Sequence, residues 1–199
     1  MKAILMSIRP QHVANILNGL KTLEIRRRFP SDYVGWVYIY CTKDHNNLLH
    51  KNCAGIWWVE DKDFQKKNKR LGIEQQPIYN GKVVARFWCD KVEEIHSILV
   101  PFTFDQTIID FYTDTFNDMN DLLKASCLDY YSLEQYLKYS QKGYAIHITN
   151  LEIFDKPKEI SEFSHYDNSQ YQALPNGEQY KGVLEPLTRA PQSFMFIEV

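Results

Sequence analysis

Three charged side chains lie close together near the start of the chain, at Lys21, Glu24 and Arg26. If this stretch is a strand, Glu24 and Arg26 are two residues apart on one face and can position each other. Lys21, at a turn before the strand, can reach the same spot. Together they offer a hydrogen-bond acceptor, a planar five-donor fork and a point charge. Such a set can bind a phosphate or a base edge, while the carboxylate accepts from an amine or polarises water.

The alternative is a salt-bridge ladder on the surface, which would contribute only about 0–1 kcal/mol to stability. The charge distribution bears on this choice. Residues 1–28 contain six basic residues and one acidic residue, a net charge of +5, although the whole chain carries −2. A basic zone on an acidic body favours a local anion site over non-specific coating of nucleic acid. A solvated charged edge that discourages aggregation of the sheet is the competing interpretation.

The elements that would hold these residues follow from the hydrophobic pattern. Pro10 suits the first turn of a helix, apolar residues recur at helical spacing up to Leu20, and Gly19 stands where that helix should stop. Alternating or continuous apolar runs predict six strands. With the early helix they predict an α+β class and a small β-barrel, whose strands are expected at residues 2–8, 22–28, 36–42, 82–88, 144–154 and 193–199.

The segments between these strands are predicted to be insertions in one domain of residues 1–199. They span about 43–81, 98–140 and 155–190. The charged run from Glu60 to Arg70 is compatible with a helix. Helical periodicity dominates from about 104 to 140, whereas 164–182 has no apolar period and is predicted to be a long loop.

The pattern Gly19-x-Lys21-x-x-Glu24-x-Arg26 resembles the signature of the ASCH domains, a branch of the PUA-like superfamily of small β-barrels. Residues 2–10 and 36–40 resemble the first strand and the third element of the family. The segments that resemble a longer subgroup, found among small bacterial and prophage-type proteins, are residues 144–148, 154–157, 160–163 and 190–194. The resemblance implies a nucleic-acid-related binding module, for RNA or a (modified) nucleotide held in a basic cleft.

The same resemblance implies which residues line that cleft. Ser7, at the end of the first strand, and Gln192 and Ser193, at the start of the last strand, are expected at its rim. Tyr40 is expected either to stack on a base or to belong to the core. The predicted nucleic-acid-binding residues are Ser7, Lys21, Glu24, Arg26, Arg27, Arg28, Tyr40, Gln192 and Ser193.

Some ASCH proteins are amidohydrolases that act on N4-acetylcytidine, with the motif Lys-Thr-x-Thr-x-Arg and a threonine nucleophile. In this chain Glu24 stands at the nucleophile position, and a carboxylate would form an anhydride there instead of an ester. A hydrolase of modified nucleosides or RNA, with Lys21 and Glu24 as acid/base pair, is therefore the alternative function. The site of those amidohydrolases also contains a glutamate, and the sequence does not show which residue of this chain corresponds to it. Glu93 and Glu94 are considered only because of their position in the sequence. A third possibility is a protein-interaction module of a mobile element.

Other polar clusters have simpler explanations. Cys41, His45, His50 and Cys53 lie within thirteen residues, but their spacing matches no common zinc module. His147 is expected to be a hydrogen-bonded core histidine. Aspartates occur at positions 105, 110, 114, 118 and 121. They are expected to lie on the solvated side of a helix and not to form a metal site.

The composition predicts a folded protein of the cytoplasm. The four cysteines form no Cys-x-x-Cys pair, which fits reduced thiols. No run of eighteen apolar residues and no secretory leader is present, so neither a membrane span nor export is expected. No metal and no cofactor are predicted, and the sequence does not indicate an oligomeric state.

Overall fold

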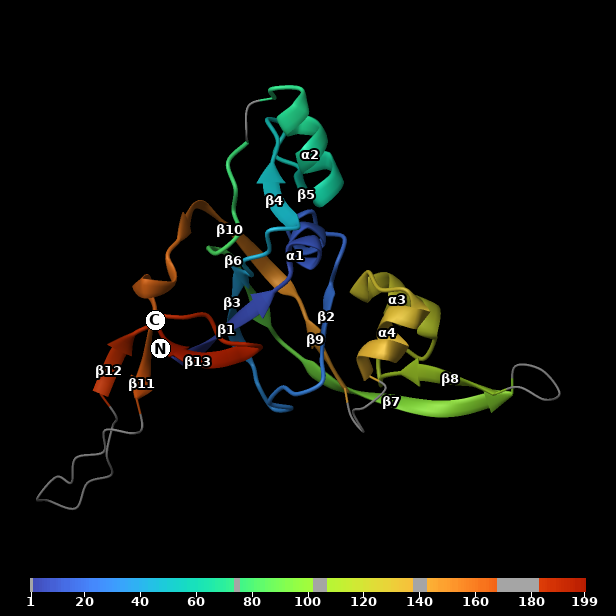
Figure 1. The fold of residues 1–199 in the computed structure, drawn as a ribbon. Coiled ribbons are helices and arrows are strands. Elements are labelled where there is room, and N and C mark those ends of the chain that lie inside the picture. Colours follow the sequence, from blue (N-terminus) through green and yellow to red (C-terminus); the bar gives the residue numbers. More distant parts are fainter. Residues whose placement is uncertain (1, 74–75, 102–106, 138–142, 168–182) are drawn as a thin grey trace, which may run out of the picture. The chain divides into compact units, whose positions relative to one another are not determined.

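The computed structural model describes residues 2–73, 76–101, 107–137, 143–167 and 183–199, and confirms the α+β class (Figure 1). Its elements are β1 (Lys2–Ile8), α1 (Pro10–Leu17), β2 (Leu23–Arg26), β3 (Gly35–Cys41), β4 (Asn47–Lys51), β5 (Trp57–Asp61), α2 (Lys62–Arg70), β6 (Val83–Cys89), β7 (Val92–Pro101), β8 (Thr107–Tyr112), α3 (Met119–Ser126), α4 (Tyr130–Leu137), β9 (Gly143–His147), β10 (Thr149–Lys158), the 3₁₀ helix η1 (Ile160–Glu162), β11 (Ser164–Asp167), β12 (Val183–Pro186) and β13 (Phe194–Glu198).

These strands form three sheets. A seven-stranded sheet has the order β10-β6-β3-β1-β13-β11-β12, and a four-stranded sheet has the order β2-β9-β7-β8. The hairpin of β4 and β5 is a separate two-stranded sheet. β1 is parallel to β3 and antiparallel to β13. The described strands thus pair as open sheets, and no closed barrel is found among them.

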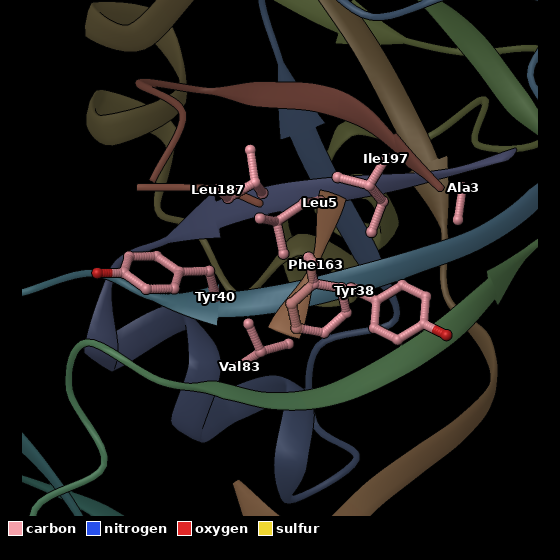
Figure 2. Close-up of a cluster of buried hydrophobic side chains, with 8 residues drawn as sticks. All are labelled: Ala3, Leu5, Tyr38, Tyr40, Val83, Phe163, Leu187 and Ile197. Atoms are coloured by element: carbon pink, nitrogen blue, oxygen red, sulfur yellow. The ribbon is translucent and has the colours of Figure 1, made fainter. Parts of the chain in front are cut away.

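The chain divides into two compact units. The first comprises Met1–Ala14, Trp36–Arg86 and Glu152–Val199, and the second comprises Asn15–Gly35 and Phe87–Leu151. The first unit has a core of aliphatic and aromatic side chains from β1, β3, β6, β13 and the segments that follow β10 (Figure 2). Its buried members are Ala3, Leu5, Tyr38, Tyr40, Val83, Phe163, Leu187 and Ile197.

The second unit has its own core, in which one face of the four-stranded sheet packs against two helices. Leu23 and Ile25 of β2 supply the strand side of this core. α3 and α4 cover it with Leu122, Leu133 and Leu137, of which the first two are fully buried. The alternation predicted for β2 is therefore confirmed for its apolar residues. The segment that carries the predicted site belongs to this unit.

The stop of α1 occurs where the sequence predicts it. Gly19 has φ = +71°, a left-handed conformation that glycine adopts without strain. Its N–H donates to the carbonyl of Ile16, and the N–H of Leu20 reaches back to the carbonyl of Asn15. This is the hydrogen-bond pattern of a Schellman motif. The N–H of Lys21 donates to the same Asn15 carbonyl, so the helix end holds the residue that begins the site.

The predicted helical stretch of 104–140 is partly wrong. The described residues from 107 to 112 form β8, which pairs antiparallel with β7. The run Thr-Ile-Ile-Asp-Phe-Tyr is rich in β-branched and aromatic residues, which suit a strand. Helices begin only at α3. β7 itself, a ten-residue strand, was not anticipated.

Three further boundaries differ from expectation. The strand expected at 144–154 is two strands, because the chain leaves the four-stranded sheet after His147 and enters the seven-stranded sheet at Thr149. Asn150, with φ = +44°, lies just after this crossing. The irregular segment 43–81 contains the β4–β5 hairpin and α2. Of the predicted loop, residues 164–167 form β11, and the remainder lies outside the described residues.

Candidate functional site

Lys21 lies where the C-terminal end of α3 meets the start of β2. Its Nζ donates to the carbonyl of Ser126 at 2.5 Å, and the N–H of Thr22 donates to the carbonyl of Ala125. These are carbonyls of the last helical turn, where the helix dipole favours a cation. The Lys21 side chain is only 2% exposed. Lys21 therefore has a structural role as well as a place in the cluster.

Glu24 joins the two cations. Its Oε2 lies 3.4 Å from the Lys21 Nζ, and its Oε1 lies 3.0 Å from an Nη of Arg26. All three residues are buried, although the Arg26 side chain remains 11% exposed. The predicted convergence of Lys21, Glu24 and Arg26 is thus present, and the interpretation as an exposed ladder does not apply. One carboxylate between two cations leaves the cluster with a net charge of +1.

The two following arginines continue away from this cluster and are exposed. Arg27 donates from Nε to the carbonyl of Tyr136, and its guanidinium lies 4.8 Å from the centroid of the Tyr136 ring. Arg27 is therefore held against α4. Arg28, two residues after the end of β2, is also exposed. Both are in the same unit as Lys21, Glu24 and Arg26.

Strand register decides which glutamate shares the face of the cluster. Arg26 is opposite Tyr144 on β9, and Tyr144 is opposite Glu94 on β7. Directly opposed residues project to the same face, so Glu94 lies in line with Arg26, two strands away, at about 9–10 Å between Cα atoms. Glu93 is opposite Ala145 and projects to the other face. The sequence could not distinguish these two glutamates.

Glu93 forms a second polar cluster, which the sequence pattern does not predict. It is buried, and its Oε1 lies 3.0 Å from the Nε2 of His147 and 2.5 Å from the Nζ of Lys91. The N–H and hydroxyl of Thr115 also donate to this carboxylate. Burial alone would raise the pKa of Glu93, but the hydrogen bonds from Lys91, Thr113 and Thr115 outweigh it and lower the pKa to about 2.

His147 is hydrogen-bonded to a carboxylate, as expected, but it is half-buried and is not a core residue. The sequence carries one signal for this cluster: Glu93 is an acidic residue between the apolar Val92 and Ile95 of a strand. The signal was weak because β7 itself was not predicted, and His147 is more than fifty residues away in the chain.

The predicted rim residues lie in the first unit. The Ser7 hydroxyl donates to the carbonyl of Pro191 at 2.6 Å, and its N–H donates to the carbonyl of Ser193. Gln192, between them, is exposed. The structure thus brings Ser7 and the 191–193 segment together. It assigns these residues to one unit and Lys21, Glu24 and Arg26 to the other.

Of the two roles expected for Tyr40, stacking on a base or packing in the core, the structure shows the second. Tyr40 is 5% exposed and belongs to the buried cluster in Figure 2, where its ring lies at one edge of the group and its hydroxyl points away from the other labelled side chains. Burial is the main cause that raises the pKa of its phenol, and the charges of Cys41 and Glu159 add to it. A base could stack on this ring only if the core opened.

The aspartates do not share a helix face. Asp110 lies in β8, where its carboxylate accepts from the N–H of Phe111, and Asp118 caps α3 by accepting from the N–H of Asn120. Asp121 follows in the first turn of α3, where the helix dipole favours an anion. Asp105 lies outside the described residues. The expectation of one solvated helical face is therefore wrong, because two of its members lie in a strand and at a cap.

The four possible zinc ligands between Cys41 and Cys53 are not gathered in one place. His50 is buried, with Nδ1 3.0 Å from the carbonyl of Pro77 and Nε2 3.1 Å from the Glu60 carboxylate. Cys41 is buried and Cys53 is exposed. Within the described ranges, no three histidine, cysteine or acidic side chains are grouped as a metal site requires. The helices in these ranges are also too short or too polar to cross a bilayer.

The fold is similar to that of a bacterial ASCH protein whose structure has been solved. A point mutant of the ASCH protein of Zymomonas mobilis matches 100% of this chain and 91% of its own, with a TM-score of 0.50 at 14% identity. The unmutated protein, at 14% identity, and a second point mutant, at 13%, each match 98% of this chain with TM-scores of 0.49, covering 87% and 88% of their own chains. No family model and no curated protein matches the sequence. The predicted ASCH resemblance is confirmed at the level of the fold.

Proposed function

We propose that this protein is a nucleic-acid-related binding module that holds RNA or a (modified) nucleotide at Lys21, Glu24 and Arg26. The observation that carries the proposal is the convergence of Lys21 and Arg26 on the single carboxylate of Glu24. The cluster keeps a net positive charge, and the exposed Arg27 and Arg28 follow it directly. The ASCH-like fold agrees with a nucleic-acid-related role, which is the role that the ASCH resemblance of the sequence implies.

The chemistry suits a nucleotide better than a simple anion. The Arg26 guanidinium is a planar donor fork that matches a phosphate or a base edge, and the Glu24 carboxylate can accept from an exocyclic amine. Arg28 would contact a flanking phosphate, which carries no information about the base. Because the cluster is buried, the ligand would approach from the side of Arg26, whose side chain is the most exposed of the three.

The test is titration of short single-stranded RNA and of single nucleotides at several salt concentrations. Replacing Arg28 with Gln should weaken RNA binding and reduce the salt slope by about 0.7 if one phosphate contact is lost. Replacing Arg26 with Lys keeps the charge but removes the fork, so nucleotide binding should fall while the fold is kept. Lys156→Gln, an exposed lysine of β10, is the matched control. Equal affinities for all four proteins, or RNA binding that ignores salt, would contradict the proposal.

The alternative function is hydrolysis of a modified nucleoside or of RNA, with Lys21 and Glu24 as the acid/base pair. One observation favours it: Glu94 shares the sheet face with Arg26, so a second carboxylate lies on the same face as the cluster. Incubation with acetylated cytidine or short RNA, compared with Lys21→Ala and Glu24→Gln, tests this function. Unchanged substrate with the wild-type protein would exclude catalysis on those substrates.

Two further expectations stay predictions. One is that residues 1–199 form a single PUA-like domain with insertions near 43–81, 98–140 and 155–190. The other is that the protein works in the cytoplasm. Limited proteolysis followed by mass spectrometry would test the first, because separately folded domains release stable fragments at their boundaries.

A further inference from the structure

The helix α2 presents a basic surface that the proposed site does not use. It carries five cations and one anion, Asp63, over nine residues, and none of its residues is buried. All five basic side chains are exposed. We call them the α2 basic face: Lys62, Lys66, Lys67, Lys69 and Arg70.

These charges make few contacts within the described part of the molecule. Within the described ranges, Lys66 has the one ion pair of the set, with Asp63 at 3.1 Å, and both partners are largely exposed. Lys62, Lys66 and Arg70 follow one another at i, i+4 and i+8, where like charges destabilise a helix. The C-terminal dipole compensates part of this repulsion for the cations of the last turn.

The opposite side of α2 is held by polar contacts to the β4–β5 hairpin. Asn68 donates to the Glu60 carboxylate at 2.6 Å, and Gln65 donates to the Glu60 carbonyl. The Asp61 side chain caps the first turn by accepting from the N–H groups of Asp63 and Phe64. Glu60 is also bound to a buried histidine of β4, so it faces away from the basic face.

An exposed aromatic ring borders these cations. Phe64 is 45% exposed and packs edge-on against Trp58, with ring centroids 5.9 Å apart. It stands three residues before Lys67, so ring and ammonium are neighbours on the helix surface. Cations beside an aromatic face are the combination by which proteins bind single-stranded nucleic acid.

We propose that α2 is a second binding surface, for the phosphate backbone of single-stranded nucleic acid. Charge complementarity selects the occupant. A lipid surface fits less well, because a membrane-surface helix needs an apolar face and α2 presents Gln65 and Asn68 opposite its cations. The proposal does not depend on the Lys21 cluster, since α2 lies in the first unit and that cluster in the second. The row from Lys62 to Arg70 is about 12 Å long, enough for several phosphates of one strand.

The experiment measures oligonucleotide binding by the full chain as a function of salt. The salt slope is the change in the logarithm of the binding constant with the logarithm of the salt concentration. In a triple variant with Lys66, Lys67 and Arg70 replaced by Gln, the magnitude of this slope should fall by about 2, because each phosphate contact contributes about 0.7. The control replaces Lys2, Lys124 and Lys156 by Gln; these exposed lysines lie on three other elements and remove the same total charge. Circular dichroism should show both variants folded, since α2 buries no side chain and the three control lysines are exposed.

A second variant separates stacking from charge. Phe64→Leu keeps apolar bulk against Trp58 but removes the aromatic face, so affinity should fall about tenfold with an unchanged salt slope. Single-nucleotide binding, which reports on the Lys21 cluster, should be unaffected by the α2 variants. Equal slopes for the wild type and the α2 triple variant would overturn the proposal. So would binding to anionic phosphatidylserine vesicles without binding to the oligonucleotide.

Discussion

The buried carboxylate of Glu93 predicts how the stability of this protein depends on pH. In the folded protein its pKa is lowered from 4.5 to about 2, because the hydrogen bonds from Lys91, Thr113 and Thr115 outweigh the cost of burial. The titratable groups that contact it are Lys91 and His147. Because the pKa is lower in the folded than in the unfolded chain, ionised Glu93 stabilises the fold.

The magnitude follows from the shift. A depression of this size corresponds to at most about 3 kcal/mol of unfolding free energy. This contribution is fully present above about pH 5 and is lost as the pH falls towards about 2. The change to study is Glu93→Gln, which keeps the shape and the acceptor oxygen but removes the charge. The half-exposed Lys91 loses its partner but stays solvated.

The assay is urea unfolding of the wild type and the variant between pH 7 and pH 2. At neutral pH the variant should be less stable by up to about 3 kcal/mol, and the two curves should converge as the pH falls through the range named above. Glu134→Gln, on α4 of the same unit, is the control and should follow the wild type closely. Parallel wild-type and Glu93→Gln curves over the whole range would refute the assignment of a strongly stabilised carboxylate.

Two other outcomes are expected. Burial is the main cause that raises the pKa of Cys41 and of Cys89 to about 12, so alkylation at pH 8 should modify the exposed Cys53 rapidly and these two thiols only after unfolding. Mass spectrometry of the labelled protein checks this, and fast labelling of Cys41 in the folded protein would contradict it. Gly143→Ala should cost about 1 kcal/mol in urea unfolding, because the new Cβ would lie 2.8 Å from a Leu137 methyl group that must move aside. Unchanged stability would show that the packing at this point is looser than described.

Much of the fold could be predicted where the signal is local. The stop of α1 at Gly19 follows from a residue that adopts positive φ without strain, and the structure has the expected hydrogen bonds there. The strands β1, β3, β6 and β13 are strongly apolar runs, and all four were located from sequence. The run from Glu60 to Arg70 is helical from Lys62, as its charge pattern allowed.

The errors arose where two periodicities compete or where a chain changes sheets. Ile108 and Tyr112 fit a helical spacing, yet this segment gains its hydrogen bonds by pairing with β7. The break between β9 and β10 leaves no strong mark in the sequence, because both sides are apolar enough for one strand. A segment chooses between such alternatives according to what packs against it, which the segment itself does not encode.

The sequence by itself determined that Lys21, Glu24 and Arg26 are near one another, because a turn and a strand fix neighbours within a few residues. It also determined the charge of α2, since nine residues carry five cations whatever surrounds them. Only the tertiary structure decided that the cluster is buried, and that Glu94 shares its face while Glu93 projects to the other. The side-chain period of a strand is two, so a shift of one residue between β7 and β9 would exchange these two glutamates. That register is set by pairing between strands far apart in the chain.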